Sequence, residues 1–170
     1  MAQKDKIVII GGGAAGFFTA INLAAQIPSS DITILERGKE VLSKVRISGG
    51  GRCNVTHAEF VPKELSVKYP RGEKELLGPF HTFMTGDTIA WFQERGVELK
   101  IEEDGRMFPW SDSSQTIIDC FLNETKRLGV TILKQCTVQE LAFAKAQYTL
   151  KTTKGDIHAS QVVVASGSSP

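Results

Sequence analysis

The chain has 170 residues, of which 41% are hydrophobic and 23% are charged, as in a soluble globular domain of ordinary size. Its 20 Lys and Arg residues nearly balance 19 Asp and Glu residues, which leaves a formal net charge of +1. Such a weak field does not gather nucleic acid or anionic lipid, so we expect neither as a partner and expect binding at a shaped site.

The N-terminal segment predicts a strand, a glycine turn, a helix and a second strand. Residues 6–10 form a β-branched run without alternation, which is typical of a strand buried on both faces. We expect a helix over about 14–27, ended by Pro28, Ser29 and Ser30, and a second strand over 31–35. Two strands joined through a helix should lie parallel with a right-handed crossover. Residues 7–25 contain no charged side chain and therefore resemble a membrane span. The glycines within 11–16 interrupt this stretch, so we expect no membrane insertion.

The middle of the chain is less regular. A helix is expected over 73–84, interrupted by Gly78 and Pro79. A short helix capped within 85–87 should end before Gly96, followed by a strand over 97–101 and a turn over 102–105.

The C-terminal third predicts one more helix and the rest of a sheet. Ser113 or Ser114 can cap a helix whose apolar stripe runs to Gly129. Core strands are expected over 130–133 and 162–165, with a meander over 137–143, 148–152 and 157–159 between them. The predicted fold is α/β, a Rossmann-type domain over 1–170 with a parallel central sheet and a β-meander.

The first glycine turn fits the dinucleotide-binding pattern G-x-G-x-x-G, directly after a strand and opening a helix. Gly11 permits the tight turn, Gly13 lets the backbone approach a pyrophosphate, and Gly16 lets the helix pack close to the strand. With Ala14 and Ala15, these residues begin a helix whose unpaired N–H groups and dipole favour that pyrophosphate.

Glu36 follows the second strand at about the spacing that this fingerprint requires. A carboxylate there can accept hydrogen bonds from the ribose hydroxyls of an adenosine. It also repels a 2′-phosphate, which argues against NADP, although the neighbouring Arg37 weakens that argument. The alternative is a connecting turn followed by an ordinary solvated carboxylate.

The unit alone does not distinguish FAD from NAD, because both contain ADP. In a compact NAD domain the third strand follows soon after the second, whereas here a long stretch separates Leu35 from Val130. A second glycine cluster in that stretch can supply main-chain N–H groups and an arginine for phosphate or flavin oxygens. The cluster consists of Ser48, Gly49, Gly50, Gly51, Arg52, Cys53 and Asn54. A meander before the last strand is also typical of FAD domains, so the sequence favours FAD.

At these residues the chain resembles the YhiN/BaiN-like family of bacterial flavoproteins, NAD(P)/FAD-dependent oxidoreductases with aminoacetone-oxidase-like members. The matching stretches are residues 11–16, Leu35-Glu36-Arg37, Lys44 leading into 48–56, 105–109 and 162–167. The chain departs from the family at His57, where members often have Asn.

The resemblance implies roles for the matching residues. The first glycine turn and Glu36 would hold the ADP portion of FAD, and the main chain at Val138 would read the adenine. The remaining FAD-binding residues would be Lys44, Ser48, Gly49, Gly50, Gly51, Arg52, Asn54, Ala165, Ser166 and Gly167. Members are usually more than twice as long, with an inserted domain and a returning C-terminal segment, so we expect this chain to be a truncated, N-terminal FAD-binding portion.

The resemblance also implies a flavin that accepts hydride or electrons from a small organic substrate, with NAD(P)H as a candidate electron donor. Amines, amino ketones and enoyl-type carbonyl compounds are the suggested substrate classes. Two alternatives stay open: a non-catalytic nucleotide-binding fragment, and an NAD-dependent dehydrogenase domain. The sequence assigns no catalytic residue and no oligomeric state.

Other reactive residues have plainer interpretations. The odd number and the spacing of Cys53, Cys120 and Cys136 suit neither disulfides nor a zinc site, so we expect packed, reduced thiols, no metal and a cytoplasmic protein. His57 and His81 are expected at the surface or in packing. Residues 102–104 are expected to form a solvated acidic turn, and Arg106 either faces the flavin or pairs with an acid.

Overall fold

The computed structural model describes residues 5–28 and 30–167. Ser29, expected at the end of the first helix, and the outermost residues of the predicted domain lie outside this part. The chain divides by its contacts into two compact units. The sheet unit runs up to Val45 and resumes at Phe121, and the middle unit is Arg46–Cys120. The prediction of one FAD-binding domain over 1–170 stays a prediction.

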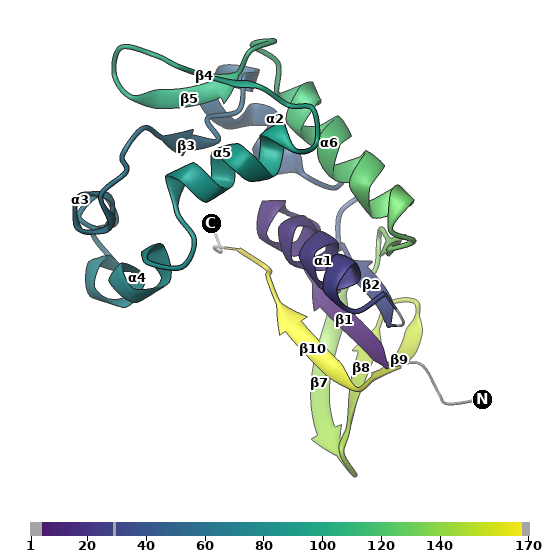
Figure 1. Ribbon diagram of the computed structural model, residues 1–170. Coiled ribbons are helices and arrows are strands. Elements are labelled where there is room, and N and C mark those ends of the chain that lie inside the picture. Colours follow the sequence, from purple (N-terminus) through teal and green to yellow (C-terminus); the bar gives the residue numbers. More distant parts are fainter. Residues whose placement is uncertain (1–4, 29, 168–170) are drawn as a thin grey trace. The chain divides into compact units, whose positions relative to one another are not determined.

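A four-stranded parallel sheet with the order β10-β1-β2-β6 forms the centre of the sheet unit. Figure 1 labels β10, β1 and β2 of this sheet. The strands are β1 (Lys6–Ile10), β2 (Asp31–Leu35), β6 (Thr131–Leu133) and β10 (Gln161–Val164), and α1 (Ala14–Gln26) connects the first two. The predicted α/β fold class, with a parallel sheet and a βαβ unit, is confirmed.

Burial explains the apolar run of β1. In β1, Ile7, Val8 and Ile9 are each 1% exposed or less. One side of the sheet is covered by α1, which buries Phe17 and Ile21 and aligns its apolar stripe with the strands.

The meander covers apolar side chains of the same sheet. Its strands β7 (Val138–Ala144), β8 (Gln147–Thr152) and β9 (Gly155–Ala159) pair antiparallel in that order. Leu150 packs in a cluster with Val8 and Leu35 of the parallel sheet. Lys145 and Ala146 have φ of 51° and 58°, values typical of a two-residue hairpin turn, so the predicted turn near Lys145 is confirmed.

The middle unit contains an antiparallel sheet of order β3-β5-β4 and three helices. Its elements are β3 (Thr56–His57), α3 (Pro62–Ser66), α4 (Glu73–Phe80), α5 (Thr85–Gln93), β4 (Leu99–Ile101) and β5 (Arg106–Pro109). Helices α2 (Ser43–Ile47) and α6 (Ser114–Arg127) cross the two boundaries, and a 3₁₀ turn spans Ser48–Gly51.

Two features of this unit differ from the expectation. Helix α4 contains Gly78 and Pro79 and ends at Phe80 instead of Met84, one residue after the proline, which lacks the N–H needed for a helical hydrogen bond to the preceding turn. β3 and β5 have no counterpart among the predicted elements: β3 has only two residues, and the four residues of β5 do not alternate between polar and apolar. Within the described part of the chain, every helix is too short or too polar to cross a bilayer.

Candidate functional site

A cleft of about 490 Å³ lies in the sheet unit where β1, β2 and β10 end. Ile10 pairs with Leu35 on one side and Val164 on the other, so these three carboxyl ends stand next to one another. The chain leaves β1 toward β2, while β10 occupies the opposite side. In open α/β sheets, ligands bind at such a switch point.

Gly11 makes the turn that closes one wall of this cleft. It adopts φ +119°, and its N–H donates to the Leu35 carbonyl at 2.8 Å. A Cβ at this position would stand 2.3 Å from the carbonyl oxygen of Ala165. Only glycine therefore allows the turn to lie against the chain that leaves β10.

Gly13 and Gly16 differ in what surrounds them. A Cβ on Gly16 would stand 2.0 Å from the Gly11 carbonyl oxygen, so this glycine is required for packing. A Cβ on Gly13 would have no neighbour within 4 Å. The structure thus gives Gly13 no packing role of its own, and leaves open space beside it.

The N-terminus of α1 borders the cleft. Gly13 is its N-cap, and neither a side-chain cap nor an acidic residue in the first turn satisfies the helix start. Ala14 and Ala15 are exposed and line the cleft with Gly13. The first N–H groups of an α-helix lack intrahelical partners and carry the positive end of its dipole, so this edge suits an anion.

Glu36 is held in one orientation by two main-chain groups. Its Oε2 accepts the Gly12 N–H at 2.9 Å, and its Oε1 accepts the Gly38 N–H at 2.6 Å. A carboxylate offers about four acceptor positions, so two remain for a ligand. The expected alternative of an ordinary solvated carboxylate does not describe this half-buried side chain.

A second cleft of about 350 Å³ continues the first and shares five lining residues with it: Gly11, Glu36, Arg37, Ser166 and Gly167. It adds Cys136, Thr137 and Val138. Val138 lies where β7 begins, before a register shift in its pairing with β8. The space is therefore large enough for a nucleoside next to a diphosphate.

Three cationic side chains, Arg37, Lys39 and Lys44, line the first cleft. Arg37 and Lys44 are both exposed, and the Lys44 Nζ lies 4.0 Å from where a Cβ of Gly167 would stand. The structure brings together all predicted site residues of the sheet unit around the two clefts except Gly16, which lies behind the turn. Their contact with FAD stays a prediction.

The second glycine cluster lies in the middle unit, so its predicted place along FAD stays a prediction as well. Gly49, Gly50 and Gly51 have φ of 56°, 69° and 90°, a left-handed run that other residues rarely adopt. A Cβ on Gly49 would stand 2.7 Å from Phe108 Cε1, whereas one on Gly50 would have no neighbour within 4 Å.

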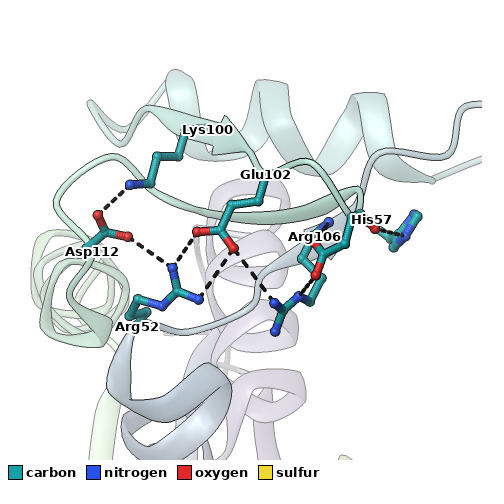
Figure 2. A network of polar contacts seen from close by, with 7 residues as sticks. Arg52, His57, Lys100, Glu102, Arg106 and Asp112 are labelled. Atoms are coloured by element: carbon teal, nitrogen blue, oxygen red, sulfur yellow. Dashed lines mark hydrogen bonds and ion pairs between the residues drawn. The ribbon is translucent and has the colours of Figure 1, made fainter.

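Arg52 and Arg106 form ion pairs with the acidic turn (Figure 2). Arg52 pairs with Glu102, whose hydrogen bond raises the pKa of the guanidinium, and Arg106 Nε donates to Asp104 at 2.7 Å. Residues 102–104 form the expected turn, in which Glu103 and Asp104 are exposed, and the two arginines in addition pair with Glu102 and Asp104. Of the two alternatives for Arg106, the structure shows the pairing with an acid.

Cys53 and His57 show no catalytic geometry. Cys53 is 6% exposed, and burial raises the pKa of its thiol. His57 Nε2 lies 3.2 Å from the Asp104 carbonyl oxygen. Among residues 5–28 and 30–167, no three His, Cys, Asp or Glu side chains stand close enough together to hold a metal ion.

Fold and cleft together define a Rossmann-type nucleotide-binding domain. A family model described as the HI0933-like protein Rossmann domain matches residues 5–170, and the chain belongs to that family. This match confirms the resemblance to the YhiN/BaiN-like flavoprotein family. It also confirms the FAD-binding class of the fold and FAD as the cofactor.

Similar proteins include two curated bacterial enzymes. The chain is 28% identical to ribosomal RNA dihydrouridine synthase of Haemophilus influenzae, covering 98% of this chain and 41% of that protein. It is 26% identical to 3-dehydro-bile acid delta(4,6)-reductase of Clostridium scindens, covering 96% of this chain and 39% of that protein. The chain therefore spans about 40% of the length of the curated relatives it matches.

Among solved structures, 3-ketosteroid-delta4-(5alpha)-dehydrogenase from Rhodococcus jostii RHA1 has the same fold. The TM-score is 0.70 with 14% identity, over 98% of this chain and 46% of that chain. Because one curated relative is named for ribosomal RNA, the exclusion of a nucleic-acid partner stays a prediction.

Proposed function

We propose that the cleft above β1, β2 and β10 holds the ADP portion of FAD and that the whole protein is a flavin-dependent oxidoreductase. One observation carries the proposal: an uncapped helix N-terminus and the fixed carboxylate of Glu36 meet at the switch point of the sheet. The diphosphate lies against the N–H groups of 13–15, and the ribose hydroxyls donate to Glu36. The adenine extends toward Val138.

Charge supports this placement. A diphosphate carries two negative charges, and Arg37 and Lys44 line the same cleft as the positive end of α1. Ala165, Ser166 and Gly167 form the adjoining wall. In the proposal, the rest of FAD meets the second glycine cluster through Ser48–Gly51, with Arg52 and Asn54 in the same loop.

FAD supplies a carrier of two electrons, and the chain's own residues bind and orient it. The names of the two curated relatives support one substrate class. Dihydrouridine is uridine with one ring C=C bond saturated, next to a carbonyl, and a delta(4,6)-reductase acts on C=C bonds. We therefore favour enoyl-type carbonyl substrates over amines and amino ketones, with NAD(P)H as the electron donor.

The cofactor is tested by purifying the protein and titrating it with FAD, ADP and NAD. The proposal expects a yellow protein that releases FAD on denaturation, and saturable binding of ADP that competes with FAD. Stabilisation by NAD but not by FAD would contradict the flavin assignment and favour the dehydrogenase alternative. A colourless protein that binds FAD no better than ADP would favour the non-catalytic alternative.

The substrate class is tested separately, with NAD(P)H oxidation followed in the absence of oxygen. A cyclic enone is compared with its saturated ketone, with an amino ketone and with a ribosomal RNA transcript. Enone-dependent oxidation is expected. Turnover of the amino ketone alone, or of the RNA alone, would overturn the small-molecule enone assignment.

A further inference from the structure

The second glycine cluster packs against the ring of Phe108, a side chain with 0% exposure. Gly49 lies against one part of this ring, since its Cβ would stand 2.7 Å from Cε1. The Arg52 guanidinium lies over the ring, 3.9 Å from its centroid. Because both residues come from one short loop, the ring fixes the loop at two points.

Main-chain hydrogen bonds fix the rest of the loop. The Cys53 N–H donates to the Ser48 carbonyl at 2.9 Å, and the Val55 N–H donates to the Met107 carbonyl at 2.8 Å. By contrast, a Cβ on Gly50 would have no neighbour within 4 Å, and one on Gly51 would meet only the Arg46 carbonyl oxygen at 4.0 Å. The loop therefore combines fixed ends with a central stretch that a ligand can approach.

The charge of Arg52 is already neutralised by acids of the middle unit. Its Nη1 pairs with Glu102, and the same nitrogen lies 3.5 Å from Asp112 Oδ1 (Figure 2). Its Nη2 lies 3.4 Å from Glu102 Oε2. Lys100 in turn pairs with Asp112, and Arg106 Nη2 lies 3.8 Å from Glu102 Oε2, so each acid is held from a second side. A guanidinium engaged in this way is poorly placed to serve as a primary phosphate ligand.

We propose that Arg52 is a positioning residue, held by Glu102 and stacked on Phe108, which fixes the open glycine stretch at 50–51 without itself contacting FAD. The inference rests on the proposed function, in which this loop meets FAD, and it replaces the expectation that Arg52 is a cofactor ligand. Arginine suits this role because its planar fork can pair with a carboxylate while its face covers an aromatic ring.

The two possible roles of Arg52 predict different effects of Glu102→Gln on the Kd for FAD. If Arg52 bound FAD directly, removing the competing carboxylate would leave FAD binding unchanged or tighten it. If Glu102 holds Arg52 in place, the substitution loosens the loop and weakens binding. For a partly exposed ion pair, we expect Glu102→Gln to raise the Kd for FAD about three- to tenfold.

The test uses Glu102→Gln, Arg52→Met and the double variant, with Glu140→Gln as the matched control. Glu140 forms an exposed pair with Lys151 at 2.7 Å in the meander. We expect the double variant to bind FAD no worse than Arg52→Met, and Glu140→Gln to bind like the parent protein. The visible absorption of bound flavin should change in the loop variants only.

A second readout does not depend on FAD. Amide ¹⁵N relaxation of Gly50 and Gly51 should show increased motion in Glu102→Gln and Arg52→Met, but not in Glu140→Gln. Unchanged relaxation in both loop variants would overturn the positioning role, and so would unchanged or tighter FAD binding in Glu102→Gln. If the parent protein bound no FAD, the proposed function would fail, while the relaxation data would still decide what holds the loop.

Discussion

Gly13→Ala separates ligand binding from folding. Gly13 has φ −91° and ψ −174°, a conformation open to any residue, and an added Cβ meets nothing within 4 Å. Alanine reduces the freedom of the unfolded chain but is a poorer N-cap than glycine, and these effects are small and opposite. We expect the free energy of unfolding to change by less than about 1 kcal/mol.

Gly13→Ala should change the affinity for ADP and FAD far more than it changes the free energy of unfolding. The added methyl occupies the open space beside Gly13, where the proposal places the diphosphate. Moving an anion away from one or two N–H donors loses about 1.5–3 kcal/mol, or roughly ten- to a hundredfold in the Kd for ADP and for FAD. Lumiflavin, which lacks the ADP portion, should show no such difference between the variant and the parent protein.

Gly16→Ala is the matched control for this experiment. Its Cβ would stand 2.0 Å from the Gly11 carbonyl oxygen, so the backbone must move, at about 1–3 kcal/mol of stability. Urea unfolding and calorimetric titration measure both quantities for each variant. Undiminished ADP affinity in a folded Gly13→Ala protein would contradict the placement of the diphosphate beside Gly13.

Three other experiments test separate parts of the structure. Glu36→Gln keeps the side-chain shape but replaces one acceptor oxygen with a donor, so ADP binding should weaken by about 1–3 kcal/mol in a calorimetric titration. An equal affinity for ADP would remove Glu36 from the site. Because burial raises the pKa of the Cys53 thiol, a thiol reagent at neutral pH should label this residue only after unfolding, as mass spectrometry of the digested protein shows; rapid labelling of folded protein would contradict its burial. The hydrogen bond from Lys100 lowers the pKa of Asp112 below its ordinary value of 3.8, so the carboxylate's stabilisation is complete well above that value and is lost as pH falls through the lowered pKa. The stability difference between the parent protein and Asp112→Asn in urea should therefore shrink below about pH 4, and a difference that grows in acid would contradict the pairing.

Local signals were sufficient to predict the sheet unit. β1 is apolar after Lys6 and β2 is buried from Ile32 to Leu35, with Thr33 as a buried polar residue, because both faces of the sheet are covered there; the glycine turn between β1 and α1 has a fixed spacing. Strand type, parallel pairing and the cleft at the strand ends follow from that spacing and from the rule for crossovers. The orientation of Glu36 by Gly12 and Gly38 could not be predicted, because it depends on how the turn closes.

The middle unit depends on contacts between distant residues. Arg52 pairs with Glu102, 50 positions later, and no local pattern connects the two. β3 contributes two residues and forms only because β5 is beside it. The difference in packing between Gly13 and Gly16 could not be predicted either, because the motif prescribes both glycines. Only the structure shows that Gly13 has open space around it and Gly16 does not.

The proposed ADP site can be located by titrating ¹⁵N-labelled protein with ADP and following the amide chemical shifts. We expect the largest changes at residues 12–15, with further changes at Gly38 and around Val138. Lys6 and Ser160 line a different cleft, at the opposite ends of the strands, and should not respond. Changes concentrated at Lys6 and Ser160, with residues 12–15 unaffected at saturating ADP, would contradict the proposed site.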